Sequence, residues 1–361
     1  MILSLEDLRP ESEQLVGSKA LNLAKVLSAG VKIPNTLVIP SGEISKILND
    51  SGLRHMIFEL SRALVSESST KDLLEMERDL KSQFLSLKLP DSFLKEVTAA
   101  VKGKISGFLI VRPSPFSPGL SDGDLKGRMP ARYCGLNEEE IQGAILKVLS
   151  ESFNLRAIAR MLDLAAYPED VSLALILQES VIPRSSGVSV CYPAGRSEIL
   201  VKSTWGLMNG APTDKFRIGI DLSDLIESEI YEKKSKILPT ERDPIEVSVD
   251  SDLWLMPSLS KEEVKSIASI SLDLSLIFGT PTVVEWMIEE GSGSLFVIQA
   301  YKESGKPKIK ALERRVVDLI ESRATEVVVK KARTETKPPA KVSIDKLTEF
   351  PLLASRIYIR G

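Results

Sequence analysis

The sequence has few of the residues that build covalent or metal-based sites. Its 361 residues include only two cysteines, Cys134 and Cys191, and one histidine, His55. Two cysteines without a CxxC spacing support neither a disulfide framework nor a cysteine metal site. A single histidine excludes a histidine-rich metal site and most histidine-based catalysis. We therefore look for candidate functional residues among side chains other than cysteine and histidine.

Long apolar runs and excess positive charge are also lacking. The N-terminus, MILSLEDLRP, has no basic segment followed by an apolar core, and no uncharged apolar run reaches about 18 residues. The formal net charge of -3 gives no signature of polyanion binding. We therefore expect an intracellular, cytoplasmic protein that binds neither nucleic acid nor a membrane.

What is present is the composition of a soluble protein with ample core, since 43% of the residues are hydrophobic and 27% are charged. Residues 43–103 interleave charged and apolar positions, which predicts a mostly helical N-terminal part. After a helical stretch at 138–164, short apolar segments separated by turn residues predict a β-rich second half. The pattern indicates an α+β fold.

The chain divides into three parts on this pattern. We expect an N-terminal lobe over residues 1–185, a C-terminal lobe over 186–305, and a third part over 306–361 that holds a helix, a linker and a short tail. The linker is the polar, proline-containing stretch TETKPPAK at 334–341.

Residues 16–34, VGSKALNLAKVLSAGVKIP, combine a turn with a helix. Apolar residues recur at helical spacing, Ser18 is a candidate N-cap, and Gly30 is a candidate stop. Lys19 then lies in the first helical turn, where the helix dipole favours an anion over a cation. On this stretch alone, Lys19 is either a solvated surface lysine or part of a phosphate site with the backbone N–H groups of Gly17 and Ser18.

A second informative segment is the predicted hairpin TVVEWMIEE and SLFVIQAY around Gly291-Ser292-Gly293. A three-residue loop places Glu290 opposite Ser294, Glu285 opposite Gln299, and Val283 opposite Tyr301. A carboxylate and an amide oxygen facing each other could share a hard cation such as Mg²⁺. The alternative is an ordinary cross-strand polar pair, and the hairpin alone does not choose between them.

Five segments in order resemble one known family. The segment at 16–34 resembles a GGKGANLAEM…AGLPVPPGF opening, and IVRPS at 110–114 resembles VRSS. LALILQESVIPRSSGVSV resembles VVVQxMVxxxxSGVxF, and STWGL resembles ASWGL. VVEWMIEEGSGSLFVIQAY resembles DIEWAxxxGxLYxLQAR. Over about residues 10–302 the chain thus resembles the N-terminal AMP/ATP-binding domain of phosphoenolpyruvate synthase and pyruvate phosphate dikinase.

The resemblance implies a two-lobed, ATP-grasp-like fold that binds ATP and Mg²⁺ and passes a phosphoryl group through a histidine toward pyruvate. Such transfer requires positioning and charge neutralisation more than covalent work by the protein. By position, the resemblance implies phosphate contacts from Lys19 and Arg112, an adenine border formed by the segment with Gln178, Glu179 and Val181, and a metal held by Glu285 and Gln299. Taken alone, the segment IVRPS favours a surface salt bridge for Arg112.

The departures from the family pattern bear on catalysis. Val283 replaces an acidic residue, and Tyr301 replaces an arginine, so that an apolar pair stands where the family has a charged one. The loop after Arg112 has prolines and a phenylalanine instead of small and acidic residues, and the glycine-rich segment after WGL is shortened to MNGAPTD. These changes affect the site more than the fold.

The family's phosphohistidine motif and pyruvate-binding barrel have no counterpart in this sequence. The leading hypothesis is therefore a kinase-like, nucleotide-binding component that acts with a separate subunit carrying the histidine and the pyruvate site. The alternative is a catalytically degenerate relative with a regulatory or assembly role. A direct kinase of another acceptor is a third reading.

Overall fold

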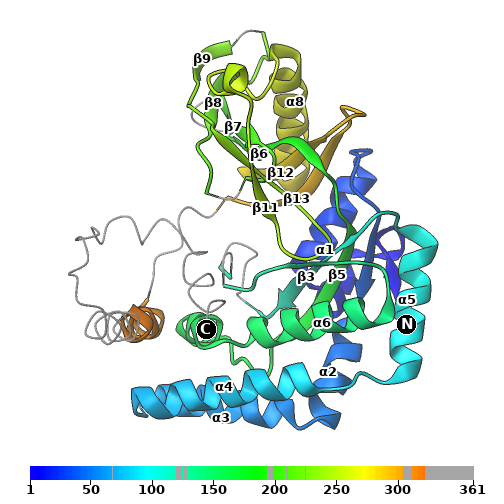
Figure 1. Ribbon diagram of the computed structural model, residues 1–361, viewed down its shortest axis with the longest axis vertical. Coiled ribbons are helices and arrows are strands. Elements are labelled where there is room, and N and C mark those ends of the chain that lie inside the picture. Colours follow the sequence, from blue (N-terminus) through cyan, green and yellow to red (C-terminus); the bar gives the residue numbers. More distant parts are fainter. Residues whose placement is uncertain are drawn as a thin grey trace.

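The computed structural model describes residues 1–66, 68–118, 124–125, 128–192, 198–208, 210–223, 225–303 and 310–321. It contains a five-stranded sheet built from the N-terminal half and a six-stranded sheet built from the C-terminal half, which lie in two lobes (Figure 1). The α+β class, with a helical N-terminal part and an antiparallel β-rich C-terminal part, is confirmed. The expected linker and short tail lie outside the described residues.

The five-stranded sheet has the order β1-β2-β5-β3-β4. All of its neighbouring strands are antiparallel, although their connections are mostly helical. Strand β3 extends to Phe116, so that Pro113 and Pro115 lie within the strand and not in the loop expected after Arg112. The strands are β1 (Leu3–Ser4), β2 (Thr36–Ile39), β3 (Leu109–Phe116), β4 (Arg132–Cys134) and β5 (Ser172–Glu179).

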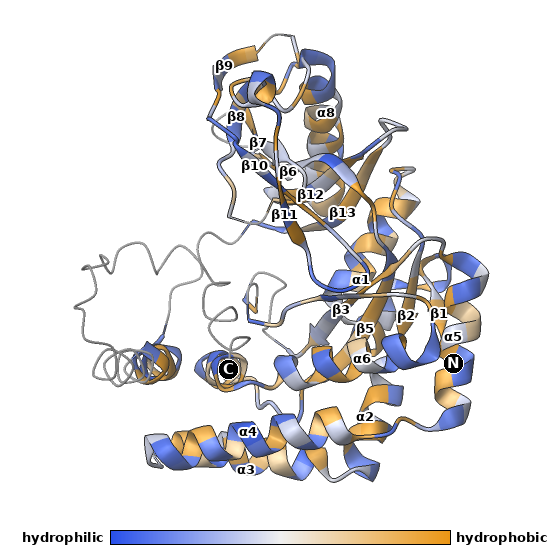
Figure 2. Cartoon of the chain, viewed as in Figure 1, coloured by the Kyte–Doolittle hydropathy of each residue, from blue (hydrophilic) through white to orange (hydrophobic). Residues whose placement is uncertain are grey.

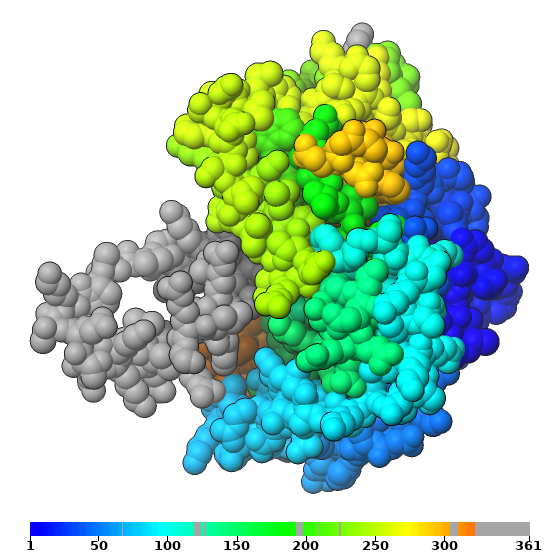
Figure 3. Space-filling view, turned by 45° about the vertical axis from the view of Figure 1, so that its right-hand side comes forward, coloured from blue at the N-terminus to red at the C-terminus, as the bar shows by residue number. Residues whose placement is uncertain are grey.

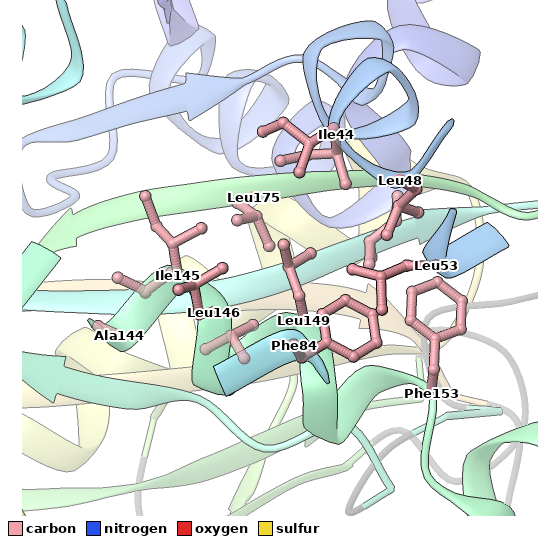
Figure 4. Packing of buried hydrophobic residues seen from close by; sticks show 14 of the residues in the cluster. Ile44, Leu48, Leu53, Phe84, Ala144, Ile145, Leu146, Leu149, Phe153 and Leu175 are labelled. Atoms are coloured by element: carbon pink, nitrogen blue, oxygen red, sulfur yellow. The ribbon is translucent and has the colours of Figure 1, made fainter. Parts of the chain in front are cut away.

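Helices cover one face of this sheet and form the main core. Apolar residues of β2, β3 and β5 pack there against α2–α7, as Figure 4 shows for Leu175, Leu149 and Phe84. In Figure 2, α3 and α4 carry hydrophobic and hydrophilic residues on different sides, as expected for helices that bury one face. The helices are α2 (Ser41–Asp50), α3 (Leu53–Val65), α4 (Thr70–Ser86), α5 (Asp91–Lys104), α6 (Glu138–Ser152) and α7 (Leu155–Asp163).

The second sheet has the order β13-β12-β6-β7-β8-β9, and α8 (Lys261–Phe278) covers one of its faces. A capping box formed by Ser260 and Glu263 starts α8, and Gly279 in the left-handed conformation ends it. The strands are β6 (Pro183–Cys191), β7 (Glu198–Trp205), β8 (Asp214–Gly219), β9 (Leu225–Glu229), β12 (Thr282–Glu289) and β13 (Leu295–Lys302). A separate ribbon is formed by β10 (Ser235–Leu238) and β11 (Ile245–Ser248).

Helix α1 (Glu13–Ser28) joins the two lobes. Its residues Ala20 and Leu23 pack on the free face of the five-stranded sheet, while Val26 packs against Val284 and Val297 of the six-stranded sheet. The space-filling view in Figure 3 shows the two lobes in close contact along their shared edge. This junction is therefore built from both halves of the chain.

The helix at residues 311–321 returns to the N-terminal lobe. Val316 and Leu319 are buried in the same core as α2–α7. Asp163 accepts hydrogen bonds from the backbone N–H groups of Leu312 and Glu313, which caps the start of this helix. In the part of the chain that the structure describes, no helix is both long enough and apolar enough to cross a membrane.

Candidate functional site

Arg112 lies where the two sheets meet. Strand β3 alternates its side chains, so that Val111 enters the helical core while Arg112 lies on the opposite face, the one covered by α1. The Arg112 side chain is only 15% exposed, which requires partners for its guanidinium group.

Those partners come from both sheets. Nη1 of Arg112 donates to Oε1 of Gln178 at 3.2 Å and to the carbonyl oxygen of Ile298 at 3.1 Å. Nη2 donates to Oε1 of Gln299 at 2.8 Å and lies 3.8 Å from Oε2 of Glu285. Four of the residues selected from the sequence are thus brought together across the lobe junction. We call Arg112, Gln178, Glu285 and Gln299 the junction cluster.

The register of the β12–β13 hairpin positions two members of the cluster. Glu285 lies opposite Gln299 and Val283 opposite Tyr301, so both predicted pairings are confirmed. The predicted pairing of Glu290 with Ser294 is wrong, because the backbone N–H of Glu289 donates to the carbonyl of Ser294.

A β-bulge explains why the predicted pairing of Glu285 with Gln299 is correct although the predicted loop is one residue too short. The pairing shifts by one residue after Glu285, where Trp286 lies opposite Val297 and Ile298 is left unpaired. This extra residue offsets the longer turn, and its carbonyl oxygen is the one that accepts from Arg112. The sequence carries no turn or glycine signal for this bulge.

Tyr301 has a polar role that differs from the packing role expected of it. Its hydroxyl donates to Oε1 of Glu285 at 3.1 Å, although its side chain is largely buried. The exchange to Val283 and Tyr301 therefore replaces a charged pair with one apolar residue and one hydrogen-bond donor to the cluster carboxylate.

Gln178 and Glu179 lie on opposite faces at the end of β5, and Val181 follows the strand. Gln178 is 1% exposed and donates to Oγ1 of Thr36 at 3.1 Å while it accepts from Arg112. Glu179 instead accepts from the backbone and hydroxyl of Ser106 and from Asn35, and so fastens loops beyond the strand end. Val181 is buried in the short segment that leads from β5 to β6.

Lys19 follows a break in α1. Gly17 has φ 74° and ψ 159°, so a second helical segment starts there, one residue before the expected Ser18 cap. The N–H of Ala20 donates to the hydroxyl of Ser114 on β3, two residues after Arg112. Lys19 is therefore in the first turn of the new segment, partly buried, on the helix that lies against β3 and β5.

The charge of Arg112 is also felt on the neighbouring strand. Burial raises the pKa of Tyr133 on β4 to about 12, while the positive charge of Arg112 partly opposes this rise. Tyr133 lies opposite Ile110, on the face of the sheet that carries Arg112. The face of the sheet at the junction thus combines a buried cation with neutral polar groups.

The oxygen donors of the cluster fit a hard cation by their chemistry. Glu285 and Gln299 present a carboxylate and an amide oxygen from opposed positions, which is the kind of donor set that Mg²⁺ accepts when phosphates and water complete its shell. In the described residues, no group of three or more His, Cys, Asp or Glu side chains could hold a metal. A metal here would therefore depend on a bound phosphate for further ligands.

Sequence reasoning missed several contributors to the site. Thr36 and Ser114 carry ordinary side chains in strands. Only the pairing of β2 with β5 brings Thr36 to Gln178, and only the packing of α1 brings Ser114 to the helix start that carries Lys19. Ile298 contributes a backbone carbonyl, for which a side-chain pattern gives no signal.

Comparison with known proteins gives matches over most of the chain. It is 22% identical over 299 residues to a probable phosphoenolpyruvate synthase of Methanothermobacter thermautotrophicus, covering 79% of this chain and 44% of that protein. It is 25% identical to a probable phosphoenolpyruvate synthase of Archaeoglobus fulgidus, covering 83% of this chain and 41% of the relative. The phosphoenolpyruvate synthase of Aeropyrum pernix is 22% identical, with 98% and 47% covered. The chain spans less than half the length of these relatives.

Among solved structures, the D-alanine-D-alanine ligase from Coxiella burnetii matches with a TM-score of 0.32 and 9% identity over 88% of this chain and 61% of that one. The sequence also matches the family described as "Pyruvate phosphate dikinase, AMP/ATP-binding domain" over residues 13–318. Because this match covers more than half of its length, the chain belongs to the pyruvate phosphate dikinase AMP/ATP-binding domain family.

Proposed function

We propose that this chain binds Mg-ATP at the junction of its two sheets and supplies a phosphoryl group to a histidine on a separate partner. The observation that carries the proposal is the junction cluster, which places a guanidinium group, a carboxylate and two amide side chains between the lobes. Membership of an AMP/ATP-binding domain family supports the choice of nucleotide.

The proposed roles of the site residues are phosphate binding, contact with adenine and metal binding. Arg112 offers a planar pair of N–H donors that suits phosphate oxygens, and Lys19 adds a second positive charge next to a helix start. The segment from Gln178 through Val181 borders the adenine as the chain passes from one sheet to the other. Glu285 and Gln299 would hold Mg²⁺, which would neutralise phosphate charge when bound.

Calorimetry with ATP on the full chain, with and without Mg²⁺, tests the binding part of the proposal. Lys19→Ala and Glu285→Gln are expected to weaken ATP binding at least about tenfold, or about 1.4 kcal/mol. The controls are Lys25→Ala, an exposed lysine of α1 whose ammonium lies over Phe278, and Glu289→Gln, a carboxylate on the same strand as Glu285. No heat at millimolar ATP, or equal binding by all five proteins, would overturn the proposal.

The partner is tested by adding a separate protein that carries the family's phosphohistidine domain. Transfer to a histidine predicts that ATP is consumed and that acid-labile phosphate accumulates on the added protein. ATP consumption at the same rate without that protein would instead favour direct phosphorylation of another acceptor.

A catalytically degenerate relative is the second candidate function. It is favoured by the hydrogen bond from the Tyr301 hydroxyl to the Glu285 carboxylate. Tyr301 stands two residues after Gln299, at the position where the family has an arginine. ATP binding without any phosphoryl transfer to the histidine domain would support this alternative.

A further inference from the structure

Arg112 lies against both oxygens to which the proposed function assigns a metal. Its Nη2 is 2.8 Å from Oε1 of Gln299 and 3.8 Å from Oε2 of Glu285. A metal ligand of Mg²⁺ lies at about 2.1 Å from the ion, so an ion on Gln299 would come next to this guanidinium group. Two cations in contact within a largely buried site repel each other strongly.

The guanidinium is held in this position from two sides. Nη1 donates to Gln178 on the N-terminal sheet and to the bulged Ile298 on the C-terminal sheet, while Nη2 faces the metal ligands. Arg112 is only 15% exposed and lies 3.8 Å from Oε2 of Glu285, so this carboxylate has a cation beside it even when no ligand is bound. Arg112 thus fills the electrostatic role of the metal.

The geometry points to a binding order. Arg112 is the cation bound to Glu285 and Gln299 in the free protein. Phosphate groups compete for Arg112, so that a divalent cation binds these oxygens more tightly after the nucleotide than before it. This inference rests on the proposed function, because it needs a polyphosphate ligand at the junction cluster. Arginine binds phosphate oxygens in a bidentate manner, so a phosphate can compete with an amide and a distant carboxylate for it.

Linkage makes this order measurable. If Arg112 and the metal exclude each other, then removing the guanidinium must raise the affinity for the metal alone. Coupling between two ligands is reciprocal and typically changes affinity about 5- to 150-fold, so an anion that engages Arg112 must also raise metal affinity.

The experiment is a titration of the full chain with Mn²⁺ in the absence of nucleotide, with free Mn²⁺ followed by electron paramagnetic resonance. Arg112→Gln is expected to bind Mn²⁺ at least about fivefold more tightly than the unchanged protein. Adding Glu285→Gln to that variant is expected to abolish the gain, which locates the ion at the junction cluster.

Arg132→Gln is the matched control. Arg132 lies on the neighbouring strand β4 opposite Val111, hence on the other face of the sheet, and is 22% exposed with Glu151 as its partner. This variant removes the same charge from a similar environment and is expected to bind Mn²⁺ as the unchanged protein does. An equal gain in both variants would show a general charge effect and overturn the inference.

A second measurement does not depend on the folding of any variant. Sulfate resembles phosphate but holds Mn²⁺ weakly, so millimolar sulfate is expected to raise the Mn²⁺ affinity of the unchanged protein by engaging Arg112. Mn²⁺ affinity that ignores both sulfate and Arg112→Gln, in a protein that binds ATP, overturns the binding order alone. Failure to bind ATP overturns the proposed function instead, so the two failures are distinguishable.

Discussion

Gly17 of α1 lies so close to Ser114 of β3 that a Cβ atom on Gly17 would stand 2.2 Å from the Ser114 carbonyl oxygen and 2.4 Å from its Oγ. Real Cβ atoms do not approach backbone this closely, so only glycine allows α1 to lie against β3 here. The same break lets the N–H of Ala20 reach the Ser114 hydroxyl. The contact fixes the helix start that carries Lys19 relative to the strand that carries Arg112.

Gly17→Ala is expected to destabilise the protein. The backbone at φ 74° and ψ 159° is a conformation that essentially only glycine adopts, which costs about 1–3 kcal/mol for another residue. The clash with Ser114 adds to this cost. Gly30→Ala is the control, because Gly30 also has positive φ but has open space around its missing Cβ. Urea unfolding should show a larger loss for Gly17→Ala, and equal losses would contradict the importance of the contact.

A buried ion pair holds together the C-terminal lobe. Lys233 and Asp214 are both fully buried, and Nζ of Lys233 lies 2.6 Å from Oδ1 of Asp214. Oδ2 of Asp214 accepts from the backbone and hydroxyl of Ser258. The pair thus joins the start of β8 to two loop segments.

Lys233→Met is expected to lower the free energy of unfolding by about 3–5 kcal/mol, because it leaves the Asp214 carboxylate buried without its cation. Lys234→Met is the matched control, since the neighbouring lysine is 59% exposed and pairs with Glu232 at the surface. That change should cost no more than about 1 kcal/mol. Chemical denaturation of both variants measures the difference, and similar midpoints would show that the buried pair contributes little.

The helix at 311–321 carries a buried carboxylate that pairs with two arginines. The Glu313 side chain is fully buried, and its Oε1 lies 2.6 Å from Nη2 of Arg128 and 3.3 Å from Nε of Arg156. Arg128 follows the β3 strand in the chain, while Arg156 belongs to α7. Through Glu313, the helix therefore joins Arg128, which lies between β3 and β4, to Arg156 of α7 in the N-terminal lobe.

Glu313→Leu is expected to destabilise the N-terminal lobe by about 3–5 kcal/mol, since it leaves the nearly buried Arg128 without its carboxylate. Asp318→Asn, at an exposed position of the same helix, should change stability by less than about 0.5 kcal/mol. Hydrogen exchange of α7 would report the loss locally. Unchanged protection of α7 in Glu313→Leu would contradict the role of this helix as part of the lobe.

Sequence reasoning reached the parts of the site that strand periodicity controls. Glu285 and Gln299 face each other because alternation along two paired strands fixes which residues share a face. Gly279 ends α8 for a similarly local reason, since glycine tolerates the left-handed conformation at this helix end.

The remaining parts depend on contacts between distant segments. Nothing near Arg112 in the sequence indicates that its partners are Gln178 and the carbonyl of Ile298, because those contacts require both sheets and a bulge. The burial of Val316 in the N-terminal core was likewise not predictable, since helical periodicity shows which face is apolar but not where that face packs.

Two buried titratable groups on strand β4 make the stability of the protein depend on alkaline pH. Burial raises the pKa of the Cys134 thiol from 9.0 to about 12, with a smaller contribution from Glu140, and burial raises that of Tyr133 from 10.0 to about 12. Between pH 9 and 12 the unfolded chain therefore loses protons that the folded chain retains. The unfolded state binds fewer protons there, so stability falls as pH rises.

Each group contributes a slope of up to about 1.4 kcal/mol per pH unit in this window. Below about pH 8 both groups are almost fully protonated in both states and contribute almost no slope. Cys134→Ala removes one titrating group, so its stability should fall less steeply between pH 9 and 11 than that of the unchanged protein, whatever its offset at pH 7. Urea midpoints at pH 7, 9, 10 and 11 measure the two slopes. Parallel curves would mean that the thiol ionises equally well in the folded core, in conflict with the burial of Cys134 against α6 and β3.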